Sequence, residues 1–119
     1  MNENKYPSQR QLKIGQQIRF FISNLFIKED FIFEQFSGKD ITVVDVVMSS
    51  DLKQAKIFIS LNPQFDNKSL IRELNRKSNL IKFKISQNLS VKFTPKIKFL
   101  YDNSLEYSKN IKDLLENIR

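Results

Sequence analysis

The apolar residues of this chain change their spacing from one segment to the next, and this change restricts the possible folds more than any other feature. Between Leu12 and Leu25 they recur in steps of three and four, which is typical of the buried face of an α-helix. Ser8 and Gln11 stand at the two positions of a capping box ahead of this run. The pattern therefore predicts a helix over residues 8–28.

Two runs with the period of β-strands follow. Residues 41–48 are rich in β-branched side chains, and residues 55–61 alternate, with Ile57 and Ile59 on the inward face. The short segment between them, which begins Ser49-Ser50-Asp51-Leu52, has the composition of a turn. The two runs are therefore predicted to form a β-hairpin.

The next segment returns to the helical period. Asp66 or Asn67 can cap a first helix, and Ser78-Asn79 interrupts the pattern because these side chains compete for backbone hydrogen bonds. A second helical face then runs to Leu89. The predicted inward residues of this kinked pair are Leu70, Ile71, Leu74, Leu80, Ile81, Ile85 and Leu89, and the outward ones of its first helix are Lys68, Arg72, Glu73 and Arg76.

A third strand is predicted over residues 96–101, after Pro95, and Asp102-Asn103-Ser104 can cap a terminal helix. The resulting order, α-β-β-α-α-β-α, favours an α+β fold in which helices cover one face of a small sheet. The 119 residues suffice for one domain. We divide them into a flexible tail (1–7), a domain (8–103) and a C-terminal helix (104–119).

Composition argues against most enzymes. The chain has no Cys and no His, which removes the thiolate nucleophile, the usual general base and the common ligands of zinc. Its two glycines, Gly15 and Gly38, are too far apart for a phosphate-binding loop or for the GxxG loop of ordinary KH domains. We predict no catalytic residue, metal site, cofactor or small-molecule substrate. No apolar run can span a membrane, and the polar N-terminus does not resemble a signal peptide, so a cytoplasmic protein is expected.

The positive charge is concentrated in one part of the chain. The formal net charge is +7, and residues 66–98 alone hold nine basic and two acidic side chains, while the segments on either side are almost neutral. Such a block favours a polyanionic partner over a lysine-rich surface that only aids solubility. Each lysine taken singly could equally be solvated, so the prediction depends on the cluster.

Two runs of the sequence resemble the ribosome-binding factor A family. The first is ITVVDV at 41–46 with SDL at 50–52 and AKIFIS at 55–60, and the second is Val91-Lys92 with Pro95, Phe99 and YDNSL at 101–105. They occur in the family's order and separation, and the resemblance extends over residues 8–118. It implies a KH-like fold of the α-β-β-α-α-β kind (type II), with a kinked helix pair in place of a GxxG loop.

The resemblance also implies where RNA would bind. The family carries an Ala-x-Gly step at the kink, and this chain has Lys77-Ser78-Asn79, in which Asn79 can adopt the left-handed conformation that Gly supplies. Flanking cations and backbone N–H groups at such a kink can contact a phosphate chain. The predicted RNA-binding residues are Lys68, Arg72, Arg76, Lys77, Ser78, Asn79, Lys82, Lys84, Lys92, Arg10 and Lys13.

Two features have a more ordinary interpretation beside the functional one. Arg10 and Lys13 match basic positions of the family's first helix, but ordinary surface charges explain them equally well. The eleven Phe residues could stack on bases, yet most lie on apolar faces, so filling the core is the favoured interpretation. Phe58 lies on the opposite face of its strand, which is either open or covered by the terminal helix.

The function that the resemblance implies is assembly of the small ribosomal subunit. A monomer would bind 16S rRNA and the free 30S subunit, support late maturation and precursor processing, and matter most at low temperature. Two alternatives remain: a KH-like protein that binds other transcripts, and a module that binds proteins and no RNA.

Overall fold

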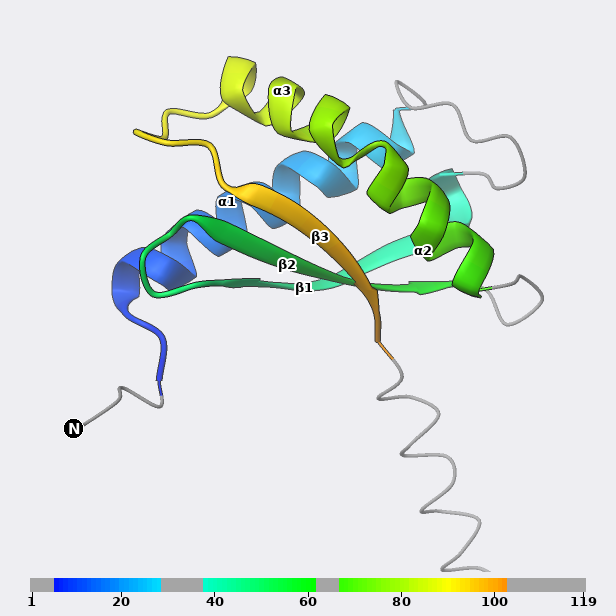
Figure 1. Ribbon diagram of the computed structural model, residues 1–119, viewed down its shortest axis with the longest axis horizontal. Coiled ribbons are helices and arrows are strands. Elements are labelled where there is room, and N and C mark those ends of the chain that lie inside the picture. Colours follow the sequence, from blue (N-terminus) through cyan, green and yellow to red (C-terminus); the bar gives the residue numbers. More distant parts are fainter. Residues whose placement is uncertain (1–5, 29–37, 62–66, 103–119) are drawn as a thin grey trace, which may run out of the picture.

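The computed structural model describes residues 6–28, 38–61 and 67–102, and these form one α+β unit (Figure 1). The elements are α1 (Gln9–Ile27), a 3-10 turn η1 (Gly38–Asp40), β1 (Ile41–Met48), β2 (Gln54–Leu61), α2 (Asn67–Arg76), α3 (Ser78–Asn88) and β3 (Lys96–Tyr101). The order predicted for this part of the chain is therefore confirmed. The predicted helix over 104–119 and the capping residue Asp66 lie outside the described residues.

The three strands form one mixed sheet in the order β1-β2-β3. β1 and β2 are antiparallel and form the predicted hairpin, whereas β3 lies parallel to β2. The crossover between these parallel strands contains α2 and α3, and all three helices lie on the same face of the sheet (Figure 1). A β-bulge between Val43 and Asp45 shifts the register of β1, and the Asp45 carboxylate accepts the backbone N–H of Val46 there (2.8 Å).

Sequence-local chemistry fixes α1 as predicted. Ser8 and Gln11 form the complete capping box: the Ser8 hydroxyl accepts the N–H of Gln11 (3.1 Å), and the Gln11 amide accepts the N–H of Ser8 (2.7 Å). Gly15 then allows α1 to lie close to β1, because a Cβ at this position would stand 3.0 Å from the carbonyl oxygen of Val46. The capped helix is thus held directly against the sheet.

The core lies between the helices and the sheet. Its fully buried members include Ile18 and Ile22 of α1, Ile57 and Ile59 of β2, and Phe99 of β3. The opposite face of the sheet carries Lys56 and Lys98, which are exposed register partners, and Phe58, which is half-buried beside Leu100. Phe58 therefore lies on the face away from the helices.

The free edge of β3 is held by a side chain of α2. The Asn75 amide donates to the carbonyl of Phe99 (3.2 Å) and accepts the N–H of Phe99 (2.9 Å). These two bonds replace those of a fourth strand, and they fix the end of α2 relative to the sheet.

We expect Asn75→Ala to lower the free energy of unfolding by about 2 kcal/mol, because two partly buried backbone groups lose their partners. Asn75→Asp should lose at least as much, because its carboxylate still accepts the N–H of Phe99 but sets a second oxygen, which has no proton to donate, against the Phe99 carbonyl. Urea denaturation of the three proteins tests this order. If Asn75→Ala were as stable as the wild type, water would replace the two hydrogen bonds of Asn75 with no loss in the free energy of unfolding.

Candidate nucleic-acid interface

The bend between α2 and α3 is formed by one residue, Lys77. Its backbone (φ −95°, ψ 6°) lies outside the helical range, while its N–H is shared between the carbonyls of Glu73 (3.2 Å) and Leu74 (3.0 Å). The carbonyl of Lys77 accepts the N–H of Ile81 (3.1 Å), so Lys77 closes the last turn of α2 and begins the first turn of α3. The chain is deflected here without being opened into a loop.

This geometry corrects the predicted basis of the kink. The sequence predicts an interruption at Ser78-Asn79, where Asn79 could adopt a left-handed conformation, but both residues belong to α3. Among the described non-glycine residues, the one with positive φ is Leu52 in the β1–β2 turn. A bend made at Lys77 with negative φ has no need of glycine, which explains why this chain can replace the Ala-x-Gly step.

Lys77 also forms an ion pair across the bend. Its Nζ lies 3.5 Å from Oε1 of Glu73, one turn earlier. Glu73 was predicted to point outward, but it is buried, with 8 % of its surface exposed. A carboxylate at this depth requires a compensating partner, and Lys77 supplies one. Lys77 therefore stabilises the bend more directly than it adds free positive charge to the surface.

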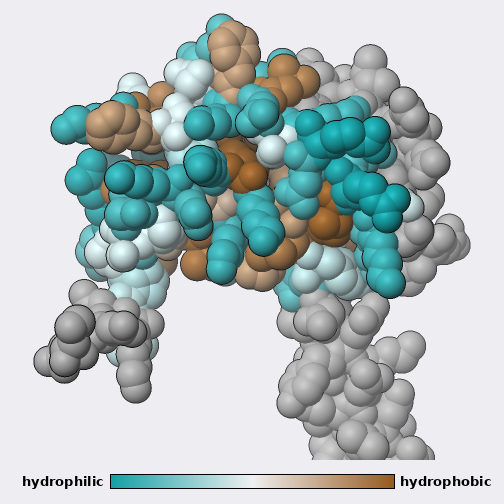
Figure 2. Space-filling view, in the orientation of Figure 1, coloured by the Kyte–Doolittle hydropathy of each residue, from teal (hydrophilic) through white to brown (hydrophobic). Residues whose placement is uncertain are grey.

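The exposed charge of α2 forms a single stripe. Lys68, Arg72 and Arg76 are spaced four residues apart and all three are exposed. Figure 2 shows strongly hydrophilic side chains gathered over this helix. Next to the stripe, α3 starts without a side-chain cap, so the backbone N–H groups of its first turn have no capping acceptor among the described residues. A row of cations beside such N–H groups is suited to phosphate oxygens.

The cations of α3 do not all join this stripe. Lys82 and Lys84 are both half-buried, and side chains two residues apart point about 200° apart around a helix. Lys84 faces α1, where it lines a hollow with Phe21, Asn24 and Lys28. The predicted residue set is therefore divided between the α2 side and the α1 side of α3. Ser78 is half-buried, and Asn79 is exposed at the bend.

Among the residues that the structure describes, no carboxylate lines the hollows on the α1 side. Neither α1 nor α3 contains an acidic residue, and the hollows between them are lined by apolar side chains such as Phe20 and Phe21 together with cations and side-chain amides. Lys13 belongs to this surface, which also includes Gln16, Gln17, Asn24 and Asn88. Sequence reasoning missed the amides. The signal that could have found them is the complete lack of Asp and Glu in both helices, because it marks a surface that does not repel an anion.

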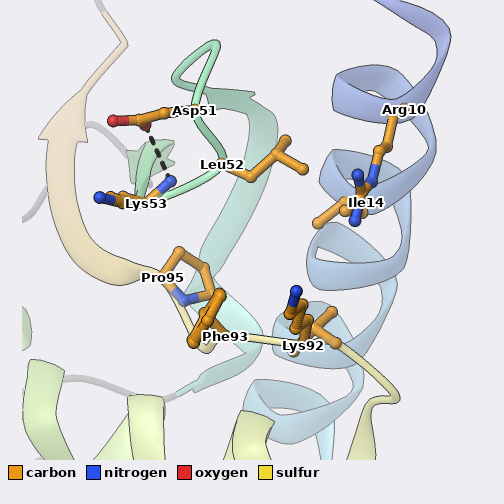
Figure 3. A pocket seen from close by; sticks show the side chains of 9 residues that line it. Arg10, Ile14, Asp51, Leu52, Lys53, Lys92, Phe93 and Pro95 are labelled. Carbon is orange, nitrogen blue, oxygen red and sulfur yellow. Dashed lines mark hydrogen bonds between the residues drawn. The ribbon is translucent and has the colours of Figure 1, made fainter.

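The remaining two predicted residues, Arg10 and Lys92, come close together in space, although 82 positions separate them in the sequence. They line one cavity, which is also lined by Lys53 and Phe93, two residues that the sequence did not single out (Figure 3). The expectation that Phe residues fill the core is confirmed for Phe26 and Phe99. It is wrong for Phe20, Phe83 and Phe93, which are largely exposed.

Other kinds of site find no support in the part of the chain that the structure describes. None of its helices combines the length and the apolar character needed to cross a membrane. Within the same residues, no three Asp or Glu side chains come together as metal ligands would.

Comparison with known proteins gives a consistent result. A family model described as "Ribosome-binding factor A" matches residues 10–115. A ribosome-binding factor A of Pelagibacter ubique is 35% identical over 112 residues, which cover 94% of this chain and 92% of that protein. One from Chelativorans sp. is 36% identical and covers 93% of this chain and 84% of that protein.

Solved structures share the fold. The solution structure of a putative ribosome binding factor A from Thermotoga maritima gives a TM-score of 0.67 at 21% identity, covering 87% of this chain and 96% of that one. The crystal structure of ribosome-binding factor A from Thermus thermophilus gives 0.63 at 13% identity, covering 76% and 94%. The predicted KH-like α+β fold is thereby confirmed. On its sequence match over nearly the whole chain, this protein belongs to the ribosome-binding factor A family.

Proposed function

We propose that the protein binds the free 30S subunit through 16S rRNA and supports its late maturation and precursor processing. The single observation that carries this is the exposed stripe of Lys68, Arg72 and Arg76 beside the uncapped start of α3, in a KH-like fold. A homology model of the Thermus thermophilus factor, fitted into a map of a 30S complex, has the same fold (TM-score 0.61, 14% identity, 75% of this chain and 91% of that one). The residues assigned to RNA binding remain part of this proposal.

The physical role of the stripe is to hold the RNA backbone in one arrangement. Cation–phosphate contacts give affinity with little reading of sequence, and the rRNA fold itself then supplies the specificity. The carboxylate-free surface of α1 and α3 extends the favourable potential around the bend. Binding of this kind involves no catalytic step. It stabilises one RNA arrangement, and the protein must dissociate before translation begins.

Sedimentation of a lysate at low and high salt tests the function. We expect the protein to migrate with free small subunits at low salt and to be released at high salt, because log K falls with log salt at a slope of about −0.7 to −0.9 per phosphate contact. Spread through the gradient at low salt would instead indicate a protein that binds other transcripts. Absence from all RNA-containing fractions at every salt concentration would indicate a protein-interaction module.

A further inference from the structure

A cavity of about 260 Å³ lies beside the β1–β2 turn, at the end of the sheet away from α2 (Figure 1). Figure 3 shows Arg10 and Ile14 approaching it from α1, Leu52 and Lys53 from the β1–β2 turn, and Phe93 from the loop between α3 and β3. We call it the loop pocket. Three segments that are remote in sequence therefore build one hollow.

The walls of the loop pocket are held by hydrogen bonds. The Asp51 carboxylate accepts the hydroxyl of Ser49 (2.7 Å) and the N–H of Lys53 (3.0 Å), which fixes the turn. The carbonyl of Lys53 in turn accepts the N–H of Lys96 (2.9 Å), which ties the turn to the start of β3. Pro95, between the loop and β3, is fully buried. The pocket is thus formed in advance of any ligand.

The lining carries an excess of positive charge. Arg10, Lys53 and Lys92 are exposed, and none of them has an acidic side chain within 4 Å among the residues that the structure describes. Asp51 is the one carboxylate of the lining. The hydroxyl of Ser49 lowers its pKa, as does the N–H of Lys53, so it stays ionised and holds the turn. Three cations against one engaged carboxylate favour an anion such as a phosphate.

The pocket also offers an aromatic surface. Phe93 is 69 % exposed, and the Nζ of Lys92 lies 5.6 Å from the centre of its ring. An aromatic ring next to cations is the combination on which single-stranded RNA stacks its bases while its phosphates are neutralised. The volume lies just below the roughly 300–1,000 Å³ of pockets that enclose a whole small ligand, so it suits one unit of a longer chain.

We propose that the loop pocket binds one unpaired nucleotide of the bound RNA, with its base on Phe93 and its phosphate on Arg10, Lys53 and Lys92. This rests on the proposed function, since it names a second contact on the same class of partner. It places that contact away from α2, so the RNA would reach the protein at two separated points. No side-chain amide lines the pocket, and stacking on a ring face accepts any base.

The test uses the absence of Trp from the chain, because Phe93→Trp then places the one tryptophan of the protein in the pocket, where it can be excited apart from the three tyrosines. We expect a short oligoadenylate to quench this fluorescence. Phe58→Trp is the control, since Phe58 lies on the face of the sheet away from the helices and does not line the pocket. Phe93→Ala should bind the oligoadenylate roughly tenfold more weakly than the wild type, within the range for one base stacked on a ring.

Three outcomes would overturn the proposal. The first is unchanged Phe93→Trp fluorescence at oligoadenylate concentrations that saturate the wild type in an anisotropy titration. The second is equal quenching in Phe58→Trp, which would mean that RNA coats the surface without using the pocket. The third is equal quenching by polyphosphate, a polyanion without bases, which would reduce the pocket to an anion site.

Co-sedimentation with 30S subunits separates this proposal from the proposed function. If the wild type binds subunits and Phe93→Ala binds them equally well, the loop pocket fails alone. If the wild type does not bind subunits but oligoadenylate still quenches Phe93→Trp, the pocket stands and the ribosomal function fails.

Discussion

Reversing the charge of Arg72 and Arg76 together is expected to abolish binding to the free 30S subunit. Both side chains are exposed on one face of α2, four residues apart, so Arg72→Glu with Arg76→Glu replaces two adjacent attractive charges by two repulsive ones. We expect the affinity for purified 30S subunits to fall at least about 100-fold, since each charged hydrogen bond contributes roughly 1.5–3 kcal/mol.

The salt dependence should change along with the affinity. Losing two phosphate contacts makes the plot of log K against log salt shallower by about 1.4 to 1.8. Filter binding or co-sedimentation at several salt concentrations measures both quantities. The fold should survive, because neither arginine is buried and Asn75, which lies between them in sequence, keeps its bonds to β3. Circular dichroism and urea denaturation verify this.

The matched control lies on the opposite face of the sheet. Lys56→Glu with Lys98→Glu makes the same change in net charge at two exposed register partners on the face away from the helices. This variant should lose affinity only through the general field of the protein, and therefore much less. Undiminished binding by the arginine variant, or an equal loss in both, would contradict a footprint on α2.

Much of the fold could be predicted because local chemistry and burial point the same way. The capping box at Ser8, the alternating strands and the turn that begins at Ser49 each specify their element within a few residues, and the structure agrees. The parallel arrangement of β2 and β3 adds no local signal of its own, but it follows once a helical crossover separates two strands.

The misassigned residues depend on packing between elements, which periodicity does not contain. Glu73 stands on the border of the apolar face of α2, and Lys77, one turn later, brings a cation that compensates the burial of its carboxylate. Leu80 was expected inside, but α3 presents Ile81 and Ile85 to the core and leaves Leu80 49 % exposed. A rotation of a short helix by a fraction of a turn decides both cases.

The candidate site was predictable in charge but not in shape. The basic block over 66–98 contains the α2 stripe, which the helical period alone places on one face. Lys92 belongs to the same block in the sequence, but in the structure it lies beside α1 and the β1–β2 turn, near Arg10 and Lys53. A linear count of charge does not contain such long-range neighbours, and so the loop pocket became visible only in three dimensions.

Phe99→Ala is expected to lower the free energy of unfolding by about 4 kcal/mol, the largest effect on stability that we predict for a single residue. Phe99 is completely buried on β3, under the helices, and its ring lies 6.5 Å from that of Phe26 on α1. Its removal leaves a cavity where α1 and β3 meet, and a domain of this size has only about 5–15 kcal/mol of stability to lose. Urea denaturation measures the change.

Phe93→Ala is the control for this substitution, because it removes the same side chain six residues earlier from an exposed position. Its stability should stay within about 0.5 kcal/mol of the wild type. Equal stability of Phe99→Ala and the wild type would contradict the described core. A large loss in Phe93→Ala would show that its ring supports the loop before β3. The two variants therefore test two roles for Phe residues that are close in sequence. Phe99 holds the sheet to α1, whereas Phe93 leaves its ring exposed to a partner.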